Sequence, residues 1–480
     1  MNYHNLSDIQ KALSSGETTL TEIVATYLTK IRETVDLNIY LEVFSEEAIE
    51  RATELQRKFE TDPKSVGPLF GMVISIKDVI CYKGHVTSAS SKILKEFRSV
   101  YNATALQRAL DADAIVIGRT NCDEFAMGST NENSAYGPTT NGKFPDCVPG
   151  GSSGGAAVSV QMDTCLVALG SDTGGSIRQP AAFCGIYGFK PTYGRISRYG
   201  LIAYGSSFDQ IGILGKDPND IESMLSVIEG CDEKDATSIE NLLQDTNSEV
   251  DRKESFAYFP QVIQNESIDS QIKDAFRNTI KGLRELEFQV DAIDFDLLEY
   301  LVPTYYVLTT AEASSNLSRY DGVVFGNRAN SQIDDIENML VSTRSQGFGK
   351  EVKRRIMMGS FVLSVGYYDA YFNKALKVRR LINEQITKIF DTYDFIIMPV
   401  SPSPPWKLGE ALEDPVSMYL ADVYTVLANL CGIPAISIPL ESEPGQPPVG
   451  IQIMSKRLED TRVLRLARQL SRKNTILTPL

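Results

Sequence analysis

Short apolar runs alternate with segments of helical periodicity along most of the chain. Seven runs are short and begin or end near Gly, Asp or Pro, which predicts β-strands at residues 71–76, 114–119, 165–170, 255–260, 394–400, 435–440 and 449–455. The helix expected at 267–286 has its apolar positions three or four apart, at Ile272, Phe276, Ile280 and Leu283. This alternation predicts an α/β fold in a single large domain, with a mixed β-sheet core flanked by helices on both faces.

The ends and two interior stretches show other patterns. Residues 7–32 carry helix-start signals, including a capping-box spacing from Thr19 to Glu22, and residues 459–473 read as an amphipathic helix. Residues 216–255 are acidic and polar, as in surface helix and loop. Residues 326–349 show no clear helix or strand periodicity, and they fit either a mobile lid or an exposed connection.

Composition narrows the class of protein. No apolar run approaches the roughly 18 residues of a membrane helix, and the first ten residues lack the basic and apolar regions of a signal peptide. We therefore expect a soluble, cytoplasmic protein. Its seven cysteines never form a CxxC pair, which argues against a disulfide framework and a zinc site. The net charge of −15 opposes extensive contact between this chain alone and a nucleic-acid backbone.

Two stretches rich in Gly and Ser, at residues 149–162 and 170–185, lie where strands are expected to turn into helices. Glycine permits a sharp turn of the backbone there and has no side chain to cover the amide N–H groups. Such turns can therefore bind anions or oxyanions. Neither stretch fits GxxxxGK[ST] or GxGxxG, which disfavours a nucleotide site. A purely structural role in close helix packing remains an alternative.

The second stretch combines a serine with a candidate oxyanion hole. The hydroxyl of Ser176 is a possible nucleophile, and the hole would use the backbone amides of Thr173, Gly174, Gly175 and Ser176 itself.

A serine nucleophile needs a base, and histidine is scarce in this chain. His4 lies in a terminal segment and His85 follows a glycine in an expected turn, so a Ser-His-Asp triad is disfavoured. Lys77 directly follows an apolar strand, where burial would lower its pKa. We therefore predict Lys77 as the base.

Three segments, residues 71–80, 149–160 and 170–195, resemble the amidase signature family in order and spacing. The resemblance implies one amidase domain over residues 1–480 with its catalytic core at about 66–215. It also implies a Ser-cisSer-Lys triad in which Ser176 is the nucleophile, Ser152 the bridging serine and Lys77 the base, with a cis peptide at Gly151–Ser152.

Within that family, residues 120–142, 194–212 and 348–372 resemble the branch that supplies ammonia to tRNA-dependent amidotransferases. The resemblance implies glutamine as substrate, bound by segments within about 300–430. The residues implied in glutamine binding are Arg355, Asp422, Tyr306 (with Tyr305 as the alternative register), Met127 and Gly128.

The same resemblance implies partners and cofactors. B and C subunits would accompany the chain, ATP and Mg²⁺ would bind to a partner, and tRNA would bind through the complex, with no cofactor or metal in this chain. The product would be Gln-tRNA(Gln) made from Glu-tRNA(Gln), and Asp-tRNA(Asn) is a further possible acceptor. The alternatives are a stand-alone amidase acting on acyl or aryl amides and a non-catalytic glycine-rich binding module.

Overall fold

A single mixed β-sheet organises the molecule. The computed structural model describes residues 3–240, 254–329, 335–410, 415–440 and 442–473. Within these residues the sheet has eleven strands in the order β1-β3-β2-β4-β6-β5-β10-β11-β9-β7-β8. Their bounds are β1 Tyr40–Val43, β2 Val73–Lys77, β3 Ile115–Thr120, β4 Val167–Asp172, β5 Tyr187–Lys190, β6 Gln210–Gly215, β7 Ser255–Tyr258, β8 Gln289–Ala292, β9 Phe395–Pro399, β10 Ala435–Leu440 and β11 Val449–Ser455.

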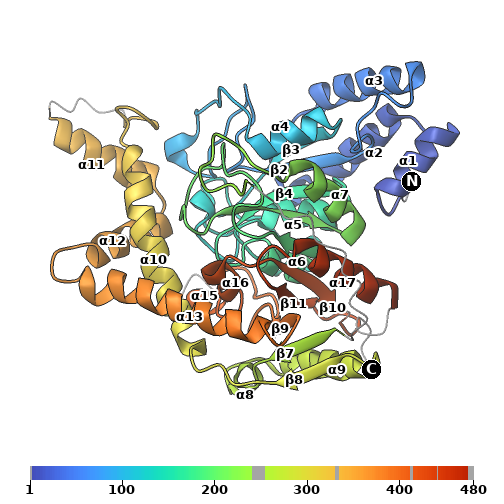
Figure 1. Ribbon diagram of the computed structural model, residues 1–480. Helices are drawn as coiled ribbons and strands as arrows, with labels where there is room; N and C mark the ends of the chain where they lie inside the picture. Colours follow the sequence, from blue (N-terminus) through green and yellow to red (C-terminus); the bar gives the residue numbers. More distant parts are fainter. Residues whose placement is uncertain (1–2, 241–253, 330–334, 411–414, 441, 474–480) are drawn as a thin grey trace.

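Helices surround the sheet and continue beyond its edges (Figure 1). The α-helices are α1 Leu6–Ser15, α2 Leu20–Glu33, α3 Ser45–Thr61, α4 Thr104–Asp111, α5 Gly154–Gln161, α6 Arg178–Cys184, α7 Pro218–Ile228, α8 Gln261–Gln264, α9 Ser270–Glu285, α10 Leu301–Asn316, α11 Ile336–Gly347, α12 Lys350–Val362, α13 Lys374–Phe390, α15 Pro415–Leu420, α16 Val426–Cys431 and α17 Asp460–Lys473. Shorter helical turns are η1 Val35–Leu37, η2 Lys92–Leu94, η3 Glu124–Ala126, η4 Leu298–Tyr300, η5 Leu317–Arg319 and the π-helix η6 Asp369–Asn373.

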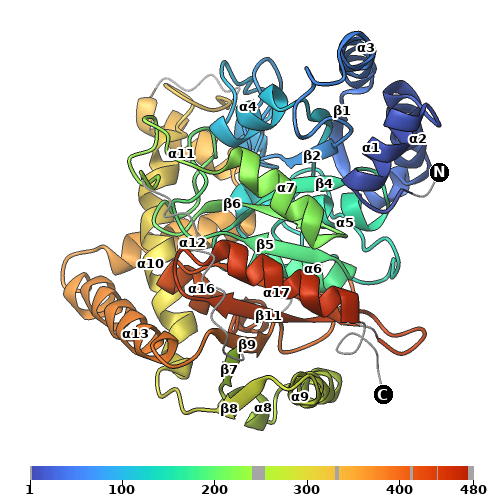
Figure 2. The same cartoon turned by 45° about the vertical axis from the view of Figure 1, so that its right-hand side comes forward.

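Both faces of the sheet are covered, as the sequence predicts. On β6, a side chain at Gly212 would meet Ile177 beside α6, whereas one at Gly215 would meet Ile221 of α7. Positions three apart on a strand face opposite ways, so α6 and α7 lie on opposite faces. Figure 2 shows α7 and α17 in front of the sheet.

The centre of the sheet joins the strands that carry the catalytic candidates. β2 pairs in parallel with both β3 and β4, and β4 pairs antiparallel with β6. All five residues of β2 are buried, which explains why their sequence is a continuous apolar run ending in a single lysine. The seven predicted strands are all present, as β2, β3, β4, β7, β9, β10 and β11.

A separate helical layer stands at one edge of the molecule. α10 packs against α12 and α13, and Figure 1 shows these helices to the left of the sheet. Residues 326–349, predicted as a lid or an exposed connection, contain the helix α11, although 330–334 lie outside the described residues. Of the acidic stretch 216–255, residues 218–228 form α7, and 241–253 lie outside the described residues.

Two further expectations concern the whole chain. In the part that the structure describes, no helix is both long and apolar enough to cross a membrane. All seven cysteines are free thiols.

Candidate active site

Lys77, the last residue of β2, is completely buried and contacts three serines. Its Nζ donates to the hydroxyl oxygens of Ser152 at 2.7 Å, Ser153 at 2.9 Å and Ser171 at 2.9 Å. Burial disfavours the charged ammonium and lowers the pKa of Lys77 to about 8. A neutral lysine that accepts a proton is therefore accessible close to physiological pH.

Ser152 lies in the first Gly/Ser stretch, just before α5. The peptide bond between Gly151 and Ser152 is cis, as the family resemblance implies. The Gly151 amide donates to Gln179 Oε1 at 2.9 Å, and the Asp123 amide donates to the Ser152 carbonyl at 3.2 Å. A Cβ at position 151 would lie 2.2 Å from Asp123 Oδ2, so only glycine fits between these partners.

Ser176 lies in the loop of residues 173–177 that joins β4 to α6. The residue is 8% exposed, and its hydroxyl has no hydrogen-bond partner among the described residues. Glycine precedes it because a Cβ at Gly174 would lie 2.4 Å from Tyr305 Oη, and one at Gly175 would lie 2.3 Å from Thr425 Oγ1. The close packing of these neighbours fixes the backbone beside the free hydroxyl.

The predicted oxyanion hole differs from the structure at Gly175. The Gly175 amide donates to Asp172 Oδ1 at 2.9 Å, so it is already used by a buried carboxylate. The amides of Thr173, Gly174 and Ser176 donate to no acceptor in the described residues. These three are the amides left to face an oxyanion.

A buried ion pair between Arg178 and Asp172 joins the two ends of this loop, and it was not predicted from the sequence. Arg178 Nε and Nη2 donate to the two carboxylate oxygens of Asp172 at 3.2 and 3.1 Å. Burial alone would raise the pKa of Asp172, but the Arg178 guanidinium outweighs it and holds that pKa below its ordinary value. The other N–H groups of Arg178 donate to Thr425 O, Asn429 Oδ1 and Gln452 Oε1, so all five donors are satisfied.

Arg355, on α12, lies in a cage of aromatic rings. Its guanidinium carbon is 5.3 to 5.6 Å from the ring centroids of Tyr204, Tyr306 and Tyr419. Nε donates to Glu351 Oε1 at 2.9 Å and Nη1 donates to Tyr204 Oη at 2.8 Å. Nη2 is buried without a partner in the described part of the chain, so the cage leaves the two N–H groups of this nitrogen for a ligand.

Asp422 lies in the turn between α15 and α16 and contacts Tyr306 of the same cage. Tyr306 Oη donates to Asp422 Oδ2 at 2.8 Å, and Ser129 Oγ donates to Oδ1 at 3.0 Å. Burial raises the pKa of Asp422 to about 6. Tyr306 thus touches both charged groups, which favours it over its neighbour Tyr305 as the pocket residue.

Met127 and Gly128 lie just before Ser129 in the loop that follows η3. Met127 is completely buried, and a Cβ at Gly128 would lie 2.4 Å from Asp123 Cγ. Met127 and Gly128 thus adjoin the pocket only along the chain, whereas Ser129, which was not predicted, donates to Asp422.

Comparison with known proteins now adds to this geometry. A family model described as Amidase matches residues 22–464. The chain belongs to the amidase family. It is 46% identical over 478 residues to a protein of Chlorobaculum tepidum that is named as the A subunit of glutamyl-tRNA(Gln) amidotransferase, covering 98% of each chain.

Solved structures agree with this family. The A subunit of glutamyl-tRNA(Gln) amidotransferase from Thermotoga maritima is 35% identical, with a TM-score of 0.79 over 98% of this chain and 96% of that one. A crystal structure described as an amidase is 26% identical, with a TM-score of 0.80 over 98% of this chain and 99% of that one.

Two connections join the charged pocket of this amidase to its Ser176 loop. Thr425, three residues after Asp422, donates from its hydroxyl to the Gly174 carbonyl at 2.6 Å. Asp209 accepts from Thr173 Oγ1 at 2.6 Å and from the Tyr204 amide at 2.8 Å. The pocket and the loop are therefore neighbours held by common residues.

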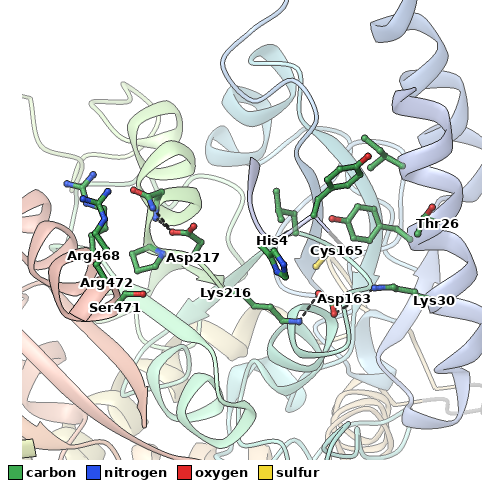
Figure 3. Close-up of a pocket in the computed structure, with 16 residues that line it drawn as sticks. His4, Thr26, Lys30, Asp163, Cys165, Lys216, Asp217, Arg468, Ser471 and Arg472 are labelled. Atoms are coloured by element: carbon green, nitrogen blue, oxygen red, sulfur yellow. Dashed lines mark hydrogen bonds and ion pairs between the residues drawn. The ribbon is translucent and has the colours of Figure 1, made fainter. Parts of the chain in front are cut away.

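A cavity of about 600 Å³ elsewhere in the amidase contains none of the predicted site residues. Figure 3 shows Lys30 and Lys216 pointing from opposite sides toward Asp163, with ion pairs of 3.7 and 2.7 Å. Arg468 at the far side pairs with Glu222. Lys30, Lys216 and Arg468, which line the cavity, are thus each paired with a carboxylate. The cavity therefore gives no reason to assign an anionic ligand. Among the described residues no group of His, Cys, Asp and Glu could hold a metal ion.

Proposed function

We propose that this chain is the glutamine-hydrolysing subunit of a tRNA-dependent amidotransferase, which supplies ammonia for conversion of Glu-tRNA(Gln) to Gln-tRNA(Gln). One observation carries the proposal: a buried arginine and a buried aspartate, Arg355 and Asp422, share Tyr306 beside the Ser176 loop. The α-carboxylate and α-ammonium of glutamine require such a pair of opposite charges. The names of the relatives in Chlorobaculum tepidum and Thermotoga maritima support it.

Substrate binding follows from the free groups of the pocket. The α-carboxylate of glutamine accepts from Arg355 Nη2, the buried donor without a partner in the described chain. The α-ammonium donates to the Asp422 carboxylate, whose position Ser129 and Tyr306 fix. The side chain then extends past Thr425 toward Ser176, so that the carboxamide reaches the nucleophile.

Acylation uses the hydrogen bond between Lys77 and Ser152, with Ser152 passing protons between Lys77 and Ser176. Neutral Lys77 accepts the proton of the Ser152 hydroxyl, and Ser152 accepts the proton of Ser176 as its oxygen attacks the carboxamide carbon. The carbonyl oxygen becomes an oxyanion near the free amides of the 173–176 loop. The C–N bond breaks, the nitrogen takes the proton back through Ser152, and ammonia leaves a γ-glutamyl ester on Ser176.

Deacylation repeats the relay with water. A water molecule gives its proton through Ser152 to Lys77 and attacks the ester carbonyl. The ester bond breaks, Ser176 regains a proton, and glutamate leaves.

The partners follow from what the chemistry needs beyond hydrolysis. B and C subunits would provide the sites for ATP and Mg²⁺, bind the tRNA and receive the ammonia in the cytoplasm. With a net charge of −15 this chain is poorly suited to bind tRNA by itself. Asp-tRNA(Asn) is a second acceptor that the same glutaminase would support.

A reconstituted complex tests the proposal. The chain assembled with candidate B and C subunits is expected to amidate Glu-tRNA(Gln) with glutamine, and to prefer glutamine strongly over a neutral acyl amide. A chain that hydrolyses the neutral acyl amide faster, with no amidation in the complex, would be a stand-alone amidase. Full amidation by the complex after replacement of both Ser176 and Lys77 would indicate that the chain is the non-catalytic binding module instead.

A further inference from the structure

The connection between α12 and α13 carries a concentration of exposed apolar and aromatic side chains. Figures 1 and 2 show this connection projecting from the left edge of the molecule. Val365 is 101% exposed and Met357 72% exposed. Exposed apolar groups that gather in one place mark an interaction site more often than scattered ones do. We call this group the aromatic surface, consisting of Met357, Phe361, Val365, Tyr367, Tyr368 and Tyr371.

The rings of the aromatic surface pack on one another. The centroid of Phe361 lies 4.4 Å from that of Tyr367 and 5.7 Å from that of Tyr371, and the two tyrosines are 6.0 Å apart. Met357 lies one turn before Phe361 on α12, so it extends the same face. Rings held this way lose little side-chain entropy on binding, and clustered aromatics are typical anchors of protein interfaces.

The aromatic surface is the outer side of the helix that supplies the substrate pocket. α12 turns Arg355 inward, where it is buried, and turns Met357 and Phe361 outward. A protein bound to this outer side would lie one helix away from the glutamine pocket. Ammonia is lost or protonated in bulk water, so a receiver placed close to its source shortens the route that must be shielded.

The charge around the surface restricts the partner. Residues 356–383 contain one acid, Asp369, and four basic residues, within a chain of net charge −15. Arg380 pairs with Glu384 at 2.7 Å, whereas Lys374 and Lys377 donate to no residue that the structure describes. A complementary protein therefore presents an apolar centre with acidic side chains around it.

We propose that the aromatic surface docks the protein subunit that receives ammonia from this chain. The inference rests on the proposed function, because it names where that function's partner binds. A second copy of this chain would bring basic side chains against basic side chains, and an RNA would leave Val365 and Met357 without apolar contacts.

The test compares two exposed valines. Val365→Asp places a charge in the aromatic surface, and Val100→Asp places the same charge at a valine that is 79% exposed in the loop between η2 and α4. With the B and C subunits and each full-length variant, we expect Val365→Asp to weaken assembly at least about tenfold, while Val100→Asp assembles like the wild type. Lys374→Glu together with Lys377→Glu should also weaken assembly, and should reduce its dependence on salt.

The outcomes separate this inference from the proposed function. Wild-type assembly by Val365→Asp overturns the docking site and leaves the function standing. A wild-type chain that neither assembles nor supports amidation overturns both. A wild-type dimer or wild-type tRNA binding that Val365→Asp abolishes would assign the surface to a second copy or to RNA, and would also overturn the inference.

Discussion

The catalytic cluster and the glutamine pocket are built by different parts of the molecule. Lys77 ends β2 and Asp172 ends the neighbouring parallel strand β4, so the central sheet sets their positions. Tyr306 and Arg355 come from α10 and α12, in the helical layer beside the sheet. The fold is shared with a solved amidase only 26% identical to this chain. Under the proposed function, the sheet positions the groups that cleave the amide, and the helical layer positions Tyr306 and Arg355 for glutamine.

The two regions also differ in how completely their charges are satisfied. Arg178, behind the catalytic loop, uses all five of its donors within the protein. Arg355 keeps Nη2 without an acceptor in the described residues. Arg178 therefore needs no ligand to satisfy its donors, whereas under the proposed function the α-carboxylate of glutamine supplies the acceptor for Arg355 Nη2. Changes in the first region should act on turnover, and changes in the second on the KM for glutamine.

Replacement of the nucleophile should have the largest effect. Ser176→Ala should abolish glutamine hydrolysis and glutamine-driven amidation, because the only other hydroxyl of the 173–177 loop, that of Thr173, donates to Asp209. Amidation driven by added ammonia should persist in the assembled complex, since that step occurs on a partner. Both activities are measured on one preparation, and loss of the ammonia-driven reaction in a folded complex would contradict the division of labour.

Replacement of the base should be nearly as damaging. Lys77→Arg keeps a positive charge but cannot accept a proton, so it should lose about as much turnover as Ser176→Ala. In the wild type the neutral form of Lys77 grows as pH rises, so turnover should increase toward a plateau above its pKa of about 8. Substantial activity in Lys77→Arg, or a rate that falls between pH 7 and 8, would eliminate the lysine base.

Removal of the pocket arginine should change binding more than turnover. Arg355→Ala removes a charged contact worth roughly 1.5 to 3 kcal/mol, so the KM for glutamine should rise about tenfold or more. Hydrolysis of a neutral acyl amide should change less. Lys353→Ala, on the exposed side of the same helix, is the matched control. Equal losses on both substrates would indicate a folding defect rather than a specificity residue.

The pocket aspartate should give a smaller, pH-dependent effect. The pKa of Asp422 is raised to about 6, so the carboxyl becomes protonated below that pH and loses its attraction for the α-ammonium. The KM for glutamine should rise as pH falls through 6, and Asp422→Asn should have a high KM without this dependence. If the dependence survives in Asp422→Asn, then Asp422 is not its source, and Asp123 and Asp209, whose pKa values are also raised to about 6, are the next carboxyl groups to replace.

Sequence alone predicted most strands of the sheet and a buried Lys77 for a clear physical reason, whereas Ser152 and the cis peptide were implied only by the family resemblance. Strands buried on both faces are continuous apolar runs, and a lysine or serine at the end of such a run stands out, as Lys77 does. Four strands were not predicted. β1 and β8 are short and lie at the sheet edges, where burial leaves no continuous apolar run. β5 and β6 are buried, but glycine and polar residues interrupt their apolar runs, as in YGFK and QIGILG.

Contacts between distant segments explain what was missed. The pairing of Arg178 with Asp172 depends on how the turn into α6 folds back, which sequence spacing does not give. The same Asp172 carboxylate also accepts from the Gly175 amide that was predicted for the oxyanion hole. Tyr204 meets Arg355 only through tertiary packing. The assignment of catalytic roles to Lys77 and Ser176 stays a prediction that the experiments above test.

The most direct measurement locates the acyl group during turnover. The assembled complex is acid-quenched while it hydrolyses glutamine, and its peptides are analysed by mass spectrometry. We predict the added mass of one γ-glutamyl group on the peptide that contains Ser176 in the wild type, and its absence in Ser176→Ala. A γ-glutamyl group on Ser152 or another residue, or glutamine hydrolysis by Ser176→Ala at the wild-type rate, would contradict the account.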